Sequence, residues 1–204
     1  MFKKKEENKF LNFDSYWRQE VKINRIDSRL NFFIEQCTGK KVLHFGCTDW
    51  PIFDEKNNLH IKLSSHTEVL HGFDIDIEGL NNLRKFVNQE YYNDFSTVLE
   101  NEYDICLIPE TIEHVDNVRD FLQNISKINA KVFLITGPNC FSKEHISRNF
   151  YGNDTFIEIV HPDHNCWYSP YTLTNQIMKY SNLAVNKVYL MEDDKMICCE
   201  ATKK

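Results

Sequence analysis

The chain has 204 residues, of which 42% are hydrophobic, 26% are charged and 13% are aromatic. This length suits one domain with a full core and is short for two, and the composition excludes a disordered or collagen-like chain. Its 24 basic and 30 acidic residues give a net charge of −6, which argues against broad electrostatic binding of nucleic acid or anionic membranes. We therefore expect a single domain over 1–204, with a helical N-terminal extension (1–38) before a core at 39–204.

We expect neither a membrane-spanning segment nor a signal peptide. The longest apolar runs, such as 132–135, are four residues long, whereas a membrane-spanning helix needs roughly 20. The first residues lack an apolar stretch, and their basic cluster at 3–5 is interpreted as a solvated terminus. Seven cysteines, an odd number with no CxxC pair, favour a reducing compartment over a disulfide framework, so we expect a cytoplasmic protein.

Apolar periodicity predicts helices that alternate with short strands. Residues spaced three and four positions apart predict a first helix over 14–37, which ends at Gly39. Later helices are predicted at 77–87, 118–128 and 170–181. Strands, recognised as short apolar runs, are predicted at 42–45, 69–73, 91–93, 103–108, 132–135, 184–191 and 195–201. Between them, 137–169 lacks periodicity and is predicted to be a long functional loop.

The type and order of these elements predict an α/β fold. Apolar strands without internal alternation, separated by amphipathic helices, are typical of a parallel sheet covered on both faces. The last two strands are joined by the short acidic turn 192–194, which predicts an antiparallel hairpin at one edge of the sheet. The fold class is therefore a doubly wound α/β domain.

In an open parallel sheet, ligands bind outside the carboxyl ends of the strands. The segments directly after the predicted strands are 46–49, 74–76, 94–95, 109–114 and 136–139. Within them, Asp74 can accept both hydrogen bonds of a ribose diol. Its other role would be to cap the next helix, and Asp76 can fill that role instead.

The order of these signals resembles the class I S-adenosylmethionine-dependent methyltransferases over roughly residues 40–200. The segments that carry the resemblance are KVLHFGCTD (41–49), GFDID (72–76), YDICLIPETIEH (103–114) and VFLITGPN (132–139). The resemblance implies a Rossmann-like, seven-stranded methyltransferase sheet, mostly parallel with a C-terminal antiparallel hairpin. It also implies that 39–204 is a catalytic core with S-adenosylmethionine as its cofactor.

The resemblance assigns a set of residues to the cofactor. They are His44, Gly46, Cys47, Asp49, Asp74, Ile75, Asp94, Phe95 and Pro109. The loop after the first core strand would hold the methionine part, Asp74 the ribose, and 94–95 the adenine. This loop departs from the family pattern because His44 replaces the usual acid, and Thr48 and Trp50 stand where glycines are usual. It therefore follows a different path, with Asp49 meeting the ammonium group, or the domain has lost the cofactor.

Two carboxylates and an imidazole follow the strand at 103–108. Glu110, Glu113 and His114 have the i, i+3, i+4 spacing that lets side chains converge on one point of a helical turn. With His164 from the segment 161–164, they would form a site for Mg²⁺ or Mn²⁺. This pattern is similar to that of small-RNA ribose 2′-O-methyltransferases, and part of it to ubiquinone-pathway O-methyltransferases. Alternatively the Glu-His pair anchors the turn, and His164 is a general base.

We therefore expect methyl transfer to a hydroxyl of a small or glycan-like acceptor, with His164 and Glu110 as catalytic residues. A short RNA end remains a possible acceptor despite the negative charge. Aromatic residues of the long loop would form an acceptor lid: Phe141, Phe150, Tyr151, Phe156, Trp167 and Tyr168. The alternative from another class is a non-catalytic binding or scaffold protein with a degenerate methyltransferase fold. A nicotinamide-dependent oxidoreductase is disfavoured because the chain has no GxGxxG.

Overall fold

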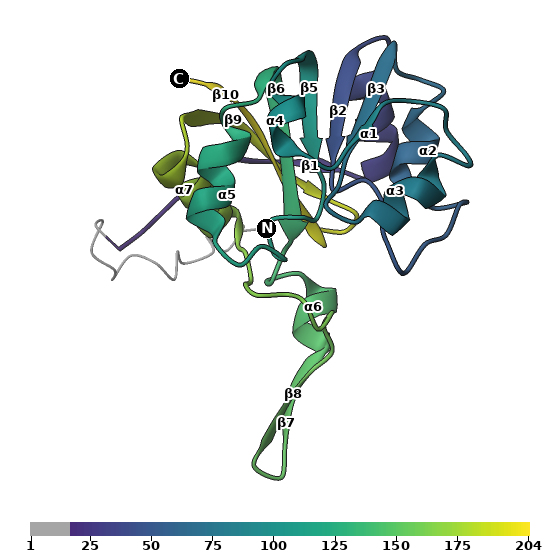
Figure 1. Cartoon of the computed structure of the whole chain (residues 1–204). Helices are drawn as coiled ribbons and strands as arrows, with labels where there is room; N and C mark the ends of the chain where they lie inside the picture. Colours follow the sequence, from purple (N-terminus) through teal and green to yellow (C-terminus); the bar gives the residue numbers. More distant parts are fainter. Residues whose placement is uncertain (1–16) are drawn as a thin grey trace, which may run out of the picture.

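The computed structural model describes residues 17–204, which form an eight-stranded sheet with helices on both faces and a separate two-stranded hairpin (Figure 1). The strands of the large sheet are β1 (Ile23–Ile26), β2 (Lys41–Phe45), β3 (Val69–Phe73), β4 (Tyr91–Tyr92), β5 (Glu102–Ile108), β6 (Asn129–Pro138), β9 (Leu183–Met191) and β10 (Met196–Lys203). Their order is β1-β9-β10-β6-β5-β2-β3-β4. In this sheet β10 runs antiparallel to both of its neighbours, whereas every other pair is parallel. The mostly parallel sheet and its C-terminal antiparallel hairpin are thus confirmed, but the expected edge position of the hairpin is wrong, because β1 pairs with β9 on its outer side.

Seven helices occur between residues 17 and 204, and each begins after a Ser, Asn or Asp whose side chain accepts a hydrogen bond from the backbone of the first turn. They are α1 (Arg29–Cys37), α2 (Leu59–Leu63), α3 (Ile77–Leu83), α4 (Phe95–Val98), α5 (Val118–Ile125), α6 (Lys143–Ser147) and α7 (Pro170–Tyr180). None of these helices is long and apolar enough to cross a membrane.

The N-terminal part of the chain differs from its prediction. The helix expected over 14–37 is wrong for residues 23–26, which form β1 and pair in parallel with β9, with Ile23 opposite Val188. Ser28 then caps the helix, which begins only at Arg29. The apolar residues at 23 and 26 fit a helical spacing, but here they pack at the edge of the sheet. The described part of the expected helical extension therefore contains a four-residue strand before its nine-residue helix, and β1 brings the sheet to eight strands. The basic cluster at 3–5 and the expected helix start at residue 14 lie outside the described residues.

The segment 137–169 also contains more structure than a loop. β6 continues to Pro138 because β10 pairs with it that far, with Met196 opposite Pro138. Beyond α6, the strands β7 (Asn149–Gly152) and β8 (Thr155–Glu158) form an antiparallel hairpin. Figure 1 shows this hairpin projecting away from the body of the domain. Its residues lack apolar periodicity because the hairpin does not pack against the large sheet.

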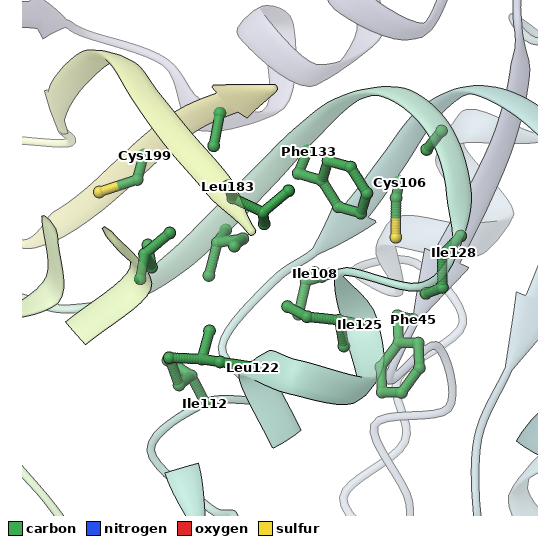
Figure 2. Close-up of a cluster of buried hydrophobic side chains, with 14 of the residues drawn as sticks. Phe45, Cys106, Ile108, Ile112, Leu122, Ile125, Ile128, Phe133, Leu183 and Cys199 are labelled. Carbon is green, nitrogen blue, oxygen red and sulfur yellow. The ribbon is translucent and has the colours of Figure 1, made fainter. Parts of the chain in front are cut away.

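Alternating residues of the central strands pack against helices on opposite faces of the sheet. On β5, Cys106 and Ile108 belong to the cluster that α5 and α7 cover, while Ile105 and Leu107 belong to the cluster under α1 and α2. Figure 2 shows the first cluster, in which Ile108 lies close to Ile125 of α5. Burial on both faces explains why these strands are apolar throughout. It also holds the carboxyl ends of β2, β3, β5 and β6 in fixed positions.

Candidate active site

A cavity of about 310 Å³ lies where β2 and β3 end and α4 begins. Its lining consists of Phe45, Gly46, Phe73, Asp74, Ile75, Phe95, Thr111, Val115, Phe121, Asn124 and Ile125. Four of these residues are phenylalanines from four different elements, and one is a carboxylate. An apolar pocket with a few polar groups is typical of a small-molecule site. The position agrees with the ligand edge expected for a parallel sheet.

The phenylalanines form a wall of mutually packed rings. The centroids of Phe45 and Phe73 are 4.4 Å apart in a stacked arrangement, and Phe121 meets Phe45 edge-on at 5.8 Å. Phe95 meets Phe73 edge-on at 6.1 Å. Such contacts add to the stability gained from burial and fix the ring positions. These rings therefore form a fixed apolar wall of the cavity.

Asp74 supplies the carboxylate in the lining of this cavity, and the loop after β2 holds its side chain in place. Its Oδ2 accepts hydrogen bonds from the Thr48 backbone N (3.1 Å) and the Thr48 Oγ1 (2.9 Å), while its Oδ1 accepts one from the Asp76 N (3.0 Å). Asp76 caps α3, as expected. A carboxylate offers about four acceptor positions, so Asp74 keeps capacity for one further donor. Thr48, at a position where the resemblance led us to expect glycine, thus orients this carboxylate.

The rest of that loop is fixed by Asn58, whose role the sequence did not reveal. Asn58 caps α2, and its Nδ2 donates hydrogen bonds to the carbonyl oxygen of Cys47 (3.2 Å) and to Oδ2 of Asp49 (2.9 Å). Asp49 has a φ of 53°, in the left-handed region that few residues adopt without support. Asn58 therefore supports the backbone of the loop after β2 at this left-handed residue.

Gly79 in α3 lets the loop after β2 pack closely against this helix, because glycine has no side chain. A Cβ at Gly79 would lie 2.6 Å from the Cβ of Thr48 and 2.8 Å from the Cβ of Trp50. In an open helix, Gly→Ala stabilises by about 1 kcal/mol. Here we expect Gly79→Ala to destabilise by about 1–3 kcal/mol, because the added methyl overpacks the loop.

Chemical denaturation of Gly79→Ala measures this effect, and Glu78→Ala, at an exposed position of the same helix, is the matched control. A stabilised Gly79→Ala variant would show that the loop does not pack tightly on α3.

Several residues assigned to the cofactor from the sequence do not line the cavity. They are His44, Cys47, Asp49, Asp94 and Pro109, whereas Gly46, Asp74, Ile75 and Phe95 do line it. Asp94 is exposed and caps α4, and the hydrogen bond from Ser96 lowers the pKa of its carboxyl. Of the pair 94–95 that was expected to bind the adenine, only Phe95 lines the cavity. Gly46 has a φ of 73°, and a Cβ there would lie 2.5 Å from Oγ1 of Thr111.

His44 faces inward and pairs with His60. Their Nδ1 atoms are 3.2 Å apart, and the Nε2 atoms of both rings are buried without a hydrogen-bond partner. Burial lowers the pKa of His60 to about 3 and that of His44 well below its usual range. Both rings are therefore neutral at physiological pH.

Glu110 and Arg29 form an ion pair that joins the end of β5 to the first turn of α1. Thr136 Oγ1 donates a 2.5 Å hydrogen bond to Oε1 of Glu110, and the Glu110 backbone N donates to Thr136 Oγ1 at 3.0 Å. Burial raises the pKa of this carboxyl, and Arg29 opposes the shift. Both carboxylate oxygens of Glu110, which we expected to be catalytic and to bind metal, thus already have protein partners. Arg29 was missed because, within a predicted helix, it looked like any charged residue.

Glu113 lies below the surface. Its side chain is fully buried, neither carboxyl oxygen has a hydrogen-bond partner, and burial raises its pKa to about 8. Burial therefore favours the protonated form of Glu113.

Three histidines come together beside this turn. Among residues 17–204, one group of side chains could together hold a metal ion: His114, His161 and His164. One ligand atom of each histidine lies within 4.8 Å of the others. Asn165 fixes the two segments to each other, because its backbone N donates to the carbonyl oxygen of Glu113 (2.7 Å) and its Nδ2 donates to that of His114 (3.1 Å). The structure thus assembles half of the expected metal set and replaces both glutamates with His161.

The aromatic residues expected to form one lid lie in three places. Tyr168 is fully buried, and Trp167 packs beside the rings of His145 and His164. Phe150, Tyr151 and Phe156 are exposed on the β7–β8 hairpin. Phe141, which is 70% exposed, lines a groove of about 810 Å³ at the base of that hairpin. The single-lid interpretation is therefore wrong, because Tyr168 belongs to the core whereas Phe150, Tyr151 and Phe156 lie on the hairpin.

The fold is similar to those of solved methyltransferases. An S-adenosylmethionine-dependent methyltransferase from Clostridium acetobutylicum ATCC 824 matches with a TM-score of 0.58 at 13% identity, over 85% of this chain and 90% of that one. The N-methyltransferase NodS from Bradyrhizobium japonicum WM9, in complex with S-adenosyl-l-homocysteine, matches with a TM-score of 0.52 at 10% identity, over 86% and 84%. A chain of the Pnkp1/Rnl/Hen1 RNA repair complex matches with a TM-score of 0.55 at 15% identity, over 86% of this chain and 40% of that one.

No protein-family model matches the sequence, and no curated protein matches it. The structural matches alone therefore identify the fold as that of the S-adenosylmethionine-dependent methyltransferases. They confirm the Rossmann-like fold that the motifs at 41–49, 72–76, 103–114 and 132–139 suggested.

Proposed function

We propose that this chain is an S-adenosylmethionine-dependent methyltransferase. The observation that carries the proposal is the cavity at the ends of β2 and β3, where four phenylalanines and the fixed carboxylate of Asp74 meet. This combination fits a nucleoside, because the rings can enclose a base while Asp74 accepts a hydrogen bond from a ribose hydroxyl. A structural neighbour that holds S-adenosyl-l-homocysteine supports the choice of cofactor.

Bound S-adenosylmethionine would supply a methyl group already activated by its sulfonium, so the protein mainly has to position the acceptor. Deprotonation of an acceptor hydroxyl is assigned to His164. The imidazole of His164 is available as a proton acceptor, because burial and the neighbouring histidines lower its pKa to about 4 and keep the ring neutral at pH 7. This low pKa also makes His164 a weak base, since a general base works best with a pKa near the working pH. Glu110 takes a positioning role instead, through its ion pair with Arg29.

The expected Mg²⁺ or Mn²⁺ site does not fit these residues. Glu110 is paired with Arg29, Glu113 is buried without a hydrogen-bond partner, and neither carboxylate converges with the histidines. We therefore route no step of methyl transfer through a metal held by these glutamates.

We infer that the acceptor carries a hydroxyl and is small or glycan-like. The groove of about 810 Å³ is large enough for such a molecule, and its charged lining includes both Arg25 and Asp194. A groove of mixed charge favours polyhydroxylated molecules over a long polyanion. A short RNA end is the second candidate, since one structural neighbour belongs to an RNA repair complex.

The opposing proposal is a binding or scaffold protein that has lost its cofactor. The observation that favours it is the loop after β2, where Thr48 already donates two hydrogen bonds to Asp74. The two proposals differ in whether the cavity admits a nucleoside.

Calorimetric titration with S-adenosylmethionine, S-adenosylhomocysteine and NADH distinguishes them. We expect the first two ligands to bind at micromolar concentrations with one site per chain, and NADH not to bind. Absence of binding at millimolar S-adenosylmethionine would exclude the enzyme and leave the scaffold. An activity screen with radiolabelled methyl donor against sugar nucleotides, phenols and RNA ends then identifies the acceptor.

A further inference from the structure

We propose that His114, His161 and His164 bind a divalent transition-metal ion of the Zn²⁺ type. This site shares two residues with the expected Mg²⁺ or Mn²⁺ site but differs in ligand set and in metal. One ligand atom of each histidine lies within 4.8 Å of the others. In a tetrahedral site with Zn–N bonds of about 2.0–2.1 Å, the ligand atoms are about 3.3 Å apart, so ring rotations that move these atoms by about 1 Å would close it.

The backbone already holds the three histidines in place. His161 and His164 lie on one turn, in which the His164 backbone N donates to the carbonyl oxygen of His161 (3.1 Å). Asn165 fixes this turn to His114 through the two hydrogen bonds described above. The Nδ1 of His164 is buried without a hydrogen-bond partner, which leaves its lone pair or proton unsatisfied. Little chain entropy therefore has to be lost when a metal binds.

The ligand chemistry decides which metal fits. Imidazole nitrogens suit Zn²⁺, Co²⁺, Ni²⁺ and Cu²⁺, whereas Mg²⁺ and Ca²⁺ require oxygen ligands, and this cluster contains no carboxylate. Three protein ligands leave the fourth position of a tetrahedral ion open to water or to another oxygen.

The three histidines lie beside the cavity, which suggests a role for the open fourth coordination position of the metal. Val115, the residue after His114, lines the cofactor cavity, as does Thr111 on the same turn. An acceptor hydroxyl bound to the metal would thus lie near the cofactor, a consequence that rests on the proposed function, whereas metal binding itself does not. The general-base role proposed for His164 applies to the metal-free chain, because a bound metal would use the lone pair of this imidazole, so methyl transfer measured with and without Zn²⁺ separates the two roles.

The test is a Co²⁺ titration of the tag-free, chelator-treated full chain, followed by visible absorption and by competition with Zn²⁺ and Mg²⁺. We expect one Co²⁺ per chain with the strong visible bands of tetrahedral coordination, displacement by Zn²⁺, and no displacement by Mg²⁺ at a hundredfold excess. We expect His161→Gln to weaken Zn²⁺ binding at least tenfold. His66→Gln, at an exposed position, should leave binding unchanged.

Other outcomes would overturn the inference. Equal binding by the chain and by His161→Gln would show adventitious metal only, as would a thiolate charge-transfer band, which would place the ion on one of the cysteines. Circular dichroism of His161→Gln checks its folding, and His114→Gln provides a second variant. S-adenosylmethionine binding is measured separately on the metal-free chain. Loss of cofactor binding with intact Co²⁺ binding would therefore contradict the proposed function and not the metal site.

Discussion

Replacing Asp74 with Ala is expected to weaken S-adenosylmethionine binding at least tenfold. The variant loses the acceptor for the ribose hydroxyl and releases three protein donors, two from Thr48 and one from Asp76. A hydrogen bond to a charged group contributes about 1.5–3 kcal/mol, which corresponds to roughly a 10- to 150-fold change in affinity. Calorimetric titration measures the dissociation constant, and the unfolding midpoint shows whether the loop has loosened.

The matched control for this prediction is Asp94→Ala. Asp94 is also an acidic residue at the end of a strand, but it caps α4 and does not line the cavity. Loss of a cap costs about 1 kcal/mol of stability, so the affinity for the cofactor should stay near that of the native chain. Equal losses in both variants would contradict the assignment of Asp74 to the ribose and return Asp94 to the role expected from the sequence.

The second large effect is a loss of stability in acid caused by His44 and His60. In the folded chain burial holds both pKa values below the usual 6.5, and that of His60 falls to about 3. The unfolded state therefore binds protons below pH 6.5 that the folded state excludes. The stability that the neutral pair contributes is complete above pH 6.5 and falls by about 1.4 kcal/mol per pH unit for each histidine as the pH is lowered.

Urea denaturation at pH 7 and pH 5 tests this prediction. The double variant His44→Leu with His60→Leu should be about as stable as the native chain at pH 7 and more stable at pH 5, because no buried imidazole remains to be protonated. His66→Gln, which is exposed, should follow the native pH dependence. An unchanged slope in the double variant would mean that the pair accepts protons without unfolding.

The sheet was largely predictable because its strands are buried on both faces. Mostly apolar runs such as Val42–Phe45 and Tyr103–Ile108 indicate such strands from the local sequence alone. The same reasoning failed at Ile23 and Ile26, whose spacing fits a helix but whose environment is the edge strand β1. The hairpin β7–β8 was not predicted because most of its side chains are exposed and show no periodicity.

The candidate site was predictable only in part. Position at a strand end was enough to select Gly46, Asp74 and Phe95. It could not show where a side chain turns, so His44 was assigned to the cofactor although it faces His60. The same limit applies to Glu110, whose partner Arg29 is 81 residues away in the sequence.

The edge strand β1 also protects the sheet against aggregation. Without it, β9 would present a row of unpaired backbone groups to other molecules, which is a template for intermolecular strand pairing. β1 is only four residues long and carries Asn24 and Arg25, two exposed polar residues that disfavour a further strand beside it. A fragment that starts after Ile26 would therefore expose β9, and its insolubility would have to be separated from any loss of cofactor binding.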